Sequence, residues 1–531
     1  MKKRIIFASI ALVCVVGLGV TAWWLTMLPE NTYGGDTSTT TAPATRQRTP
    51  TILLERTLGE NASAFLKEAR VELHGHGDDS DKKQVYTIAP NESGTLYLDT
   101  LKDLPLNTAV LQTFMESISH LETLDTIDEA PENAASYGFD TPEATVHVRY
   151  GDDTLFSFAL CPLPLSSDSN YYLQVIEDST GSVTTGADSP VYLLHASEAS
   201  PFLAPQEDYV ALDVWMTPNV SQGNEEEEYP SLTVRELKLA GTLREQPTIV
   251  RRRLKDDRPE FSAEVYLIEK PYLTSASNEE QFLSSVMSTN ALSAAACAVV
   301  FPTAEQLAEY GLDNPYSVAA YTLSVMADKK DQTGAVVSTR YHSDVTNLVK
   351  LGKKNDAGQY YAQINQVEAI YLVNADSVPW ATLTYQELAA PNVFLRNVID
   401  VERLDITHNG KTTALQLTHY PEKTGDDKLV ITANGDETLD TADFRKLYQL
   451  LMNIRRTGIS PAEPTGDPLF RIVLTPNKEG YSALTVSIYA HSASSYICQT
   501  DQGDTFKVSA SNVDTVMKQY ERYLAGDIVV M

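Results

Sequence analysis

The sequence predicts an α+β protein in which an N-terminal transmembrane helix is followed by three tandem mixed α+β repeat units rich in antiparallel strands. Two observations predict this class. Residues 5–28 carry no charged side chain, and further along the chain a Tyr-Gly-x-Asp-x-Pro element recurs between a helix pattern and paired strand patterns. Helical and strand periodicities indicate different elements, so a unit that contains both belongs to a mixed class.

The first 28 residues predict a cytoplasmic tip and a transmembrane helix. The basic run Lys2-Lys3-Arg4 precedes the uncharged segment 5–28, which is long enough as a helix to span a bilayer core of about 30 Å. Basic residues at the near end predict a cytoplasmic N-terminus. The expected location is therefore the cell membrane, with a single pass and the C-terminal bulk extracellular or periplasmic. A cleaved signal peptide, with small residues at 20–22, is the alternative.

The remaining chain divides into a stalk, three units and a linker. Residues 29–51 are rich in Thr and Pro without an apolar period, which is typical of a flexible stalk. Repeat units are predicted at 52–215, 230–392 and 393–531, the third being divergent and ending in a capping helix. Between the first two units, residues 216–229 contain four consecutive glutamates and form an acidic linker.

A shared turn identifies the units. It reads ASYGFDTP at 135–142 and AEYGLDNP at 308–315, and it decays to Gly-Asp-Pro at 466–468. Its glycine can take the left-handed conformation, its aspartate can bond to backbone amides two residues on, and its proline prevents a helix and begins a strand. This mechanism is structural, and it is favoured over a binding or catalytic role for Asp140 and Asp313.

Helix and strand patterns flank each turn. Helices are expected after Asn107, after the capping box Ser277-x-x-Glu280 and near Asp440, and a closing helix after Ser511. Strands are expected before the helices at 71–73, 237–239 and 404–406, and in pairs at 171–175, 191–194, 360–364, 370–373, 495–499 and 505–508.

These phrases resemble the domain-of-unknown-function 4340 family. The resemblance rests on SYGFDTP and EYGLDNP, each followed by a Tyr-Tyr strand, YYLQV or YYAQI, and then by VYLL or IYLV. It implies a membrane-anchored extracytoplasmic repeat protein, and some members are found beside ABC-transporter components. The family offers no catalytic residues.

The residue patterns do not indicate a catalytic centre. The sequence lacks GxSxG, HExxH and phosphate-loop motifs. His74-Gly75-His76 and the aspartates at 78, 79 and 81 have ligand chemistry for a divalent ion, but a hydrophilic turn is the favoured interpretation. We therefore expect no catalytic, cofactor-binding or metal-binding residues and no cofactor.

Cysteines, arginines and tyrosines all have structural interpretations. Cys14, Cys161, Cys297 and Cys498 lack CxxC spacing, and we interpret those outside the N-terminal apolar run as small buried hydrophobes. The basic run 251–253 is expected on a strand, balanced by acidic residues that follow it. The 27 tyrosines offer faces for sugar stacking, but half-buried strand positions explain them better.

The sequence predicts a non-enzymatic scaffold or binding protein on the outer face of the membrane, and the family resemblance adds an accessory role in an ABC-transporter complex. The alternatives are a cell-wall or glycan-binding module and an extracytoplasmic glycan hydrolase, whose carboxylate pair leaves no sequence signature. With 71 acidic and 41 basic residues among 531, the net charge of −30 excludes nucleic acid as a favoured partner and weakens binding of anionic polymers. The expected partners are the lipid bilayer, through residues 5–28, and a protein at the membrane.

Overall fold

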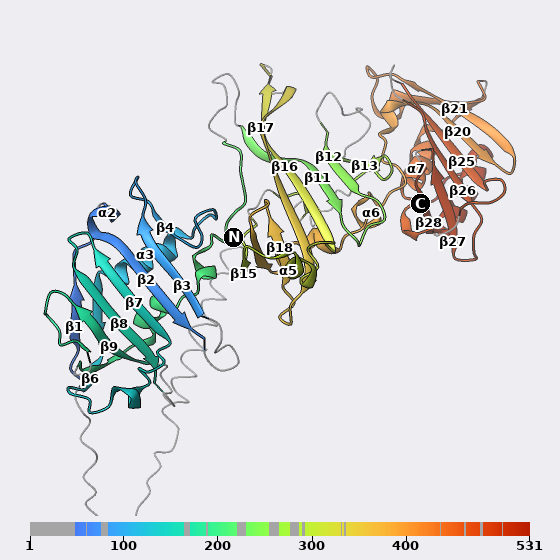
Figure 1. Cartoon of the computed structure of the whole chain (residues 1–531). Coiled ribbons are helices and arrows are strands. Elements are labelled where there is room, and N and C mark those ends of the chain that lie inside the picture. The colour runs from blue at the N-terminus through green and yellow to red at the C-terminus, as the bar shows by residue number, and fades with distance from the viewer. Residues whose placement is uncertain are drawn as a thin grey trace, which may run out of the picture. The chain divides into compact units, whose positions relative to one another are not determined.

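Antiparallel β-sheets dominate the computed structural model of the chain (Figure 1). The structure describes residues 48–59, 61–75, 83–163, 170–186, 189–219, 230–253, 265–276, 286–288, 292–330, 332–333, 336–435, 437–460, 463–477, 482–501 and 503–531.

The first large sheet has the strand order β4-β3-β2-β7-β8-β9-β10-β6. Its strands are β2 (Leu66–His74), β3 (Lys83–Pro90), β4 (Leu96–Leu98), β6 (Asp125–Asp128), β7 (Ala144–Tyr150), β8 (Leu155–Pro162), β9 (Tyr171–Asp178) and β10 (Val191–Leu194). A separate pair joins β1 (Thr51–Glu55) to β5 (His120–Thr123). The helices of this region are α2 (Ala62–Phe65), α3 (Thr108–Ser117) and α4 (Ala196–Ala199).

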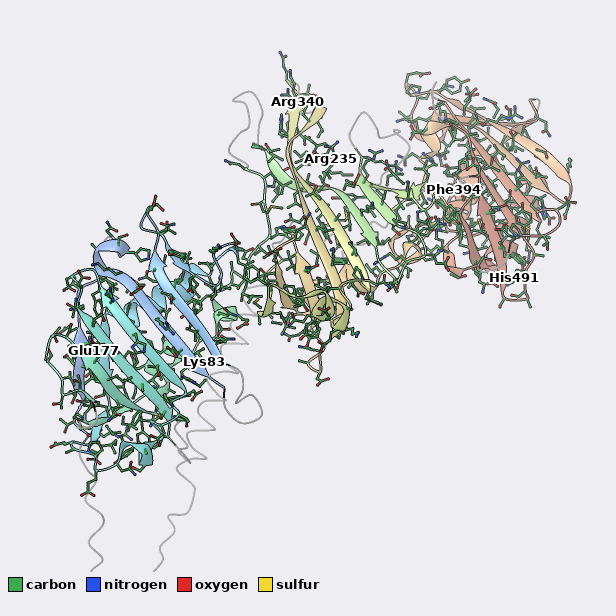
Figure 2. The ribbon with its side chains drawn as sticks, viewed as in Figure 1. Lys83, Glu177, Arg235, Arg340, Phe394 and His491 are labelled. Carbon is green, nitrogen blue, oxygen red and sulfur yellow. The ribbon has the colours of Figure 1, made fainter. Side chains whose placement is uncertain are left out.

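The second large sheet has the order β14-β13-β12-β11-β16-β17-β18-β19-β15. Its strands are β11 (Ser231–Ala240), β12 (Thr248–Arg252), β13 (Tyr266–Lys270), β14 (Thr274–Ser275), β15 (Ala296–Val300), β16 (Ser317–Lys330), β17 (Val336–Lys354), β18 (Tyr360–Ile364) and β19 (Ala369–Val373), with helices α5 (Ala304–Glu309) and α6 (Tyr385–Leu388). Strands β16 and β17 continue past the end of β11, and Arg340 marks this extension in Figure 2.

The third large sheet has the order β23-β22-β21-β20-β25-β26-β27-β28-β24. Its strands are β20 (Val401–His408), β21 (Lys411–His419), β22 (Leu429–Ala433), β23 (Glu437–Leu439), β24 (Arg456–Ile459), β25 (Phe470–Pro476), β26 (Leu484–Tyr489), β27 (Ser495–Thr500) and β28 (Thr505–Ser509), with helices α7 (Thr441–Met452) and α8 (Ala510–Leu524). Its buried side chains form a hydrophobic cluster of their own.

The three large sheets share one strand order, except that the first sheet lacks a counterpart of the edge strands β14 and β23. In each large sheet, the strand that comes first in the chain (β2, β11 or β20) lies between two neighbours. One neighbour is the next strand along the chain, and the other is the strand that follows the turn element. The second contact gives the central pairs β2·β7, β11·β16 and β20·β25. The strand that precedes the turn element, β6, β15 or β24, closes the far edge. The turn elements therefore occupy the same place in three copies of one topology. The unit boundaries given by the sequence stay predictions.

The predicted fold class is wrong. The described residues form four antiparallel sheets, where mixed α+β repeat units were predicted. The prediction treated helices and strands as equally important in each unit, whereas strands greatly outnumber helices among the described residues. Some strands also lack the alternation that sequence reasoning uses; β8, for example, buries six consecutive side chains.

No helix in the described ranges is long and apolar enough to cross a membrane. The predicted transmembrane helix at 5–28, the stalk up to residue 47 and the acidic linker from residue 220 lie outside the described residues.

Several local predictions are confirmed. The Asn107 side chain caps α3, and the Asp440 side chain caps α7. The predicted strands coincide with β2, β9, β10, β11, β18, β19, β20, β27 and β28. The closing helix α8 is capped by Ser509 instead of Ser511, and most of the helix predicted after Ser277 lies outside the described residues.

The turn element behaves largely as its residues predict. Gly138, Gly311 and Gly466 have φ values of 93°, 72° and 79°, which a side chain would make costly. Strands β7 and β16 begin two residues after the prolines of the element. The Asp313 carboxylate accepts a hydrogen bond from the amide of Asn314 at 2.8 Å, one residue on, where we predicted two.

Candidate ligand-binding groove

A groove of about 440 Å³ lies beside the turn element of the second sheet. It is lined by Thr242, Gly311, Asn314, Tyr316, Gly352, Lys353, Lys354, Tyr360 and Thr382. Its volume falls within the range of small-molecule sites, which is about 300–1,000 Å³. We call this feature the second-sheet groove.

Backbone contacts bring distant segments to the groove. The amide of Thr242, in the turn after β11, donates to the carbonyl of Pro315 at 3.1 Å. The Arg244 guanidinium donates to the carbonyls of Trp380 and Leu383 at 2.8 and 2.7 Å, which fixes the segment that carries Thr382. Three parts of the chain therefore meet around one turn.

A stacked pair of tyrosines supports one lysine. Lys354 and Tyr360 are register partners across β17 and β18, and the Lys354 ammonium lies 4.6 Å from the centroid of the Tyr360 ring. Tyr360 is 4% exposed, and the Tyr316 ring stacks on it at a centroid distance of 6.4 Å. This cation–π contact holds the Lys354 charge at the groove.

The other lysine is positioned by a close backbone approach. A Cβ atom on Gly352 would lie 2.1 Å from the carbonyl oxygen of Tyr310, so only glycine lets β17 pass this near the turn. The next side chain, Lys353, donates from Nζ to the carbonyl of Glu309 at 2.7 Å. That carbonyl ends α5, and a cation is favoured at a helix C-terminus.

The groove differs in charge from the chain as a whole. Two of its nine lining residues are lysines and none is acidic, although the chain carries a net charge of −30. Thr242, Asn314, Thr382 and both lysines are exposed. The groove therefore offers positive charge, hydroxyls and an amide to solvent.

The first sheet lacks this arrangement at the corresponding place. Tyr171 begins β9 as Tyr360 begins β18, but its register partner is Pro162 where Tyr360 faces Lys354. Glu143 stands before β7 where the second sheet has a tyrosine. Burial and then the negative charge of Glu143 raise the pKa of Tyr171. Of the first and second sheets, only the second therefore has lysines at this place.

A feature common to both sheets explains the shared tyrosines. The turn tyrosine packs against the second residue of the Tyr-Tyr strand, with centroid distances of 5.1 Å for Tyr137 and Tyr172 and 4.2 Å for Tyr310 and Tyr361. Sequence reasoning found both motifs without seeing that they contact each other. Their joint occurrence in the two copies was the available signal.

Residues 278–467, about a third of the chain, match the family model of the domain of unknown function DUF4340. This segment is similar to that family. The resemblance predicted from the sequence is confirmed there, and the DUF4340 segment contains every lining residue of the groove except Thr242. No curated protein and no solved structure matches the chain.

The described cysteines are buried, as the sequence predicted. Cys161 on β8, Cys297 on β15 and Cys498 on β27 are all free and buried. Burial raises the pKa of Cys161 and of Cys297 to about 12, and it also raises the pKa of Cys498. These thiols are therefore poor nucleophiles at neutral pH.

Two arginines of the basic run 251–253 make contacts between strands of the second sheet. Arg251 pairs with Glu269 on β13 at 2.5 Å, and Arg252 donates to the Thr233 hydroxyl on β11 at 2.9 Å. The acidic residues that we expected to balance this run lie at 256–260, outside the described residues. Within the described residues, Glu269 balances the charge of Arg251 across the strands, a pairing that the sequence order does not reveal.

The histidine and aspartate run places only its first histidine in the structure. His74 ends β2, and residues 76–82 lie outside the described ranges. Within those ranges, three or more His, Cys, Asp or Glu side chains do not gather where they could hold a metal ion.

A buried ion pair that the sequence did not predict lies at the edge of the third sheet, and α6 contacts it. Arg456 on β24 pairs with Asp504 at 2.5 Å, and their side chains are 7% and 1% exposed. The Tyr385 hydroxyl of α6 donates to the same carboxylate at 2.6 Å. Burial, and then the Asp504 charge, raise the pKa of Tyr385, so the hydroxyl stays protonated as a donor. We interpret the contacts among Arg456, Asp504 and Tyr385 as structural.

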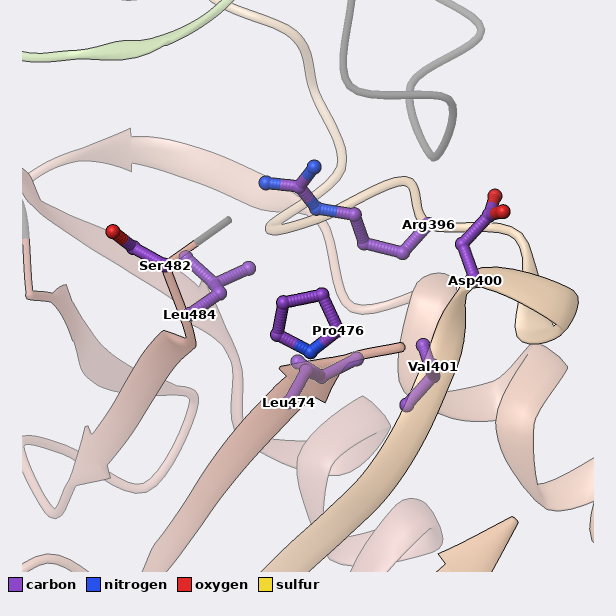
Figure 3. A pocket seen from close by; sticks show the side chains of 7 residues that line it. All are labelled: Arg396, Asp400, Val401, Leu474, Pro476, Ser482 and Leu484. Carbon is purple, nitrogen blue, oxygen red and sulfur yellow. The ribbon is translucent and has the colours of Figure 1, made fainter. Parts of the chain in front are cut away.

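A small recess lies in the third sheet. Its volume is about 20 Å³, enough for about one water molecule. Figure 3 shows its lining residues, which are Arg396, Asp400, Val401, Leu474, Pro476, Ser482 and Leu484.

Proposed function

We propose that the chain is a non-enzymatic binding protein that holds a ligand in the second-sheet groove and uses its sheets as a scaffold. The lysine pair of the groove carries this proposal. Lys353 and Lys354 are each fixed by a contact to the turn or to a buried ring, and both are exposed to an approaching ligand. Preorganised polar groups of this kind lower the cost of binding.

The repeated topology supports the scaffold role. The residues shared between copies form turns and ring contacts, as Tyr137 with Tyr172 and Tyr310 with Tyr361 do. Repeats whose shared residues are structural build extended surfaces. A glycan hydrolase needs two carboxylates about 5–10 Å apart, and the groove lining contains none.

In this role the protein would lie at the outer face of the cell membrane, attached through residues 5–28 and associated with a protein partner there. The uncharged run and the basic run at 2–4 support this location. The family resemblance supports a partner that belongs to an ABC transporter.

Cross-linking in intact membranes tests the proposal. Tagged full-length protein is cross-linked in its native host, purified and analysed by mass spectrometry, with an untagged strain as the control. Recovery of a permease or ATPase subunit with the tagged protein alone supports the accessory role. Recovery of the protein from the membrane fraction without any transporter subunit contradicts it.

A further inference from the structure

We infer that the ligand of the second-sheet groove is an anionic saccharide, a sugar or short oligosaccharide that carries a carboxylate or a phosphate. This inference rests on the proposed function, because it takes the groove as the binding site. It concerns the chemistry of the ligand, which neither the fold nor the family match specifies.

The two lysines account for the anionic group. Each ammonium has three donors, and Lys353 uses one of them on the Glu309 carbonyl. The Lys354 ammonium lies over the Tyr360 ring. Within the part of the chain that the structure describes, this ammonium donates no hydrogen bond to a protein oxygen. Because the lining contains no carboxylate, the positive charge of the pair is not neutralised within the groove.

The remaining lining groups account for the sugar. Thr242 and Thr382 supply hydroxyls, and Asn314 supplies an amide, each able to donate and to accept as sugar hydroxyls require. Tyr316 adds a half-buried ring at the side of the groove. The lining contains no aliphatic side chain, so it offers no pocket for the apolar side chains by which peptides are selected.

The groove also explains how an acidic chain could bind an anionic ligand. A chain with a charge of −30 repels anionic polymers in general. The lysine pair makes a local exception, and the first sheet, with Glu143 and Pro162 at the corresponding place, does not. One anion-binding position on an acidic protein gives selectivity through repulsion elsewhere.

Calorimetric titration of the full-length protein with trigalacturonate, with glucose 6-phosphate and with neutral galactotriose tests the inference. We expect saturable binding of at least one anionic probe and much weaker binding of galactotriose. The double substitution Lys353→Gln and Lys354→Gln is expected to weaken that binding by about 10- to 100-fold, since each charged hydrogen bond contributes strongly. The better anionic probe identifies the charged group as carboxylate or phosphate.

Matched variants make the test specific. Lys329→Gln with Lys330→Gln removes the same charge from exposed positions on β16 and is expected to leave affinity nearly unchanged. Lys353→Arg with Lys354→Arg keeps both charges and is expected to retain most of the binding. Thermal unfolding of each variant checks that the fold is intact.

Two results would overturn the inference: no saturable binding of either anionic probe to the wild-type protein, or equal loss of affinity in the Lys329 and Lys330 variant. If saccharide binding fails while membrane cross-linking still recovers a transporter subunit, the ligand class is wrong and the proposed function stands. If the probes bind as expected and no partner is recovered, the accessory role is wrong and the ligand class stands.

Discussion

Replacing Asp504 by Asn is expected to loosen the third sheet far more than its size suggests. Asparagine keeps the shape of the side chain and can still accept from Tyr385, but it leaves the Arg456 guanidinium without its countercharge. Since these side chains are 1% and 7% exposed, water cannot replace the lost carboxylate. Breaking one partner of a buried pair costs about 3–5 kcal/mol.

An exposed pair of the same length provides the control. Lys67 and Asp153 also lie 2.5 Å apart, but their side chains are 44% and 69% exposed. Asp153 has a positive φ, which asparagine tolerates well. We therefore expect Asp153→Asn to change the free energy of unfolding by less than about 1 kcal/mol.

The buried thiols give a local assay. Cys498 lies in the core of the third sheet and Cys161 lies in the first sheet, so pulsed thiol labelling with mass spectrometry reads the opening of each separately. A loss of about 3–5 kcal/mol corresponds to a rise of roughly two to three and a half decades in the Cys498 labelling rate. Labelling of Cys161 is expected to stay unchanged.

The reasoning fails if Asp504→Asn raises Cys498 labelling by less than about tenfold, or by no more than Asp153→Asn does. Either result would mean that Arg456 finds solvent or another partner, and that the buried pair does not stabilise the third sheet.

Two further predictions concern the first and second sheets. Asp178 is the last residue of β9. Partial burial opposes its ionisation, but hydrogen bonds from Thr180 and Val183 outweigh this effect and lower the pKa of Asp178 below 3.8. The contribution of the Asp178 carboxylate to the free energy of unfolding is therefore present above pH 3.8 and is lost as the pH falls through the lowered pKa. Because Asp178 is partly exposed and solvent screens its charge, urea unfolding should show Asp178→Asn destabilised by only about 0.5–1 kcal/mol at pH 7 and by less in acid. An equal difference at both pH values would contradict this. Gly352→Ala should cost about 1–3 kcal/mol because its Cβ would lie 2.1 Å from a backbone oxygen, whereas Gly458→Ala meets nothing within 4 Å and should be nearly neutral. Labelling of Cys297 in the second sheet measures Gly352→Ala, and labelling of Cys498 in the third sheet measures Gly458→Ala. Equal effects of the two substitutions would disprove the steric argument.

The sequence predicted features whose causes are local. A glycine at φ 72° and a proline two residues before a strand act through their own backbones, so the turn at Gly311 could be placed without a structure. The caps at Asn107 and Asp440 depend on neighbours one to three residues away. The class was missed because helix and strand patterns say little about how many strands join one sheet.

The groove could not be predicted because its parts are distant in sequence. Lys354 meets Tyr360 through strand register, and Thr242 and Thr382 arrive on a turn and a short helical segment that Arg244 ties together. In the sequence Lys353 and Lys354 are an ordinary basic pair in an acidic chain. The Arg456 and Asp504 pair was missed for the same reason, since nothing in the sequence shows which charges become buried.

The most direct measurement is an experimental structure of the full-length protein with the better-binding anionic saccharide. The predicted result is a ligand in the second-sheet groove with its charged group within hydrogen-bond distance of Lys353 or Lys354. A saccharide bound on another sheet, with this groove empty, would contradict the central claim.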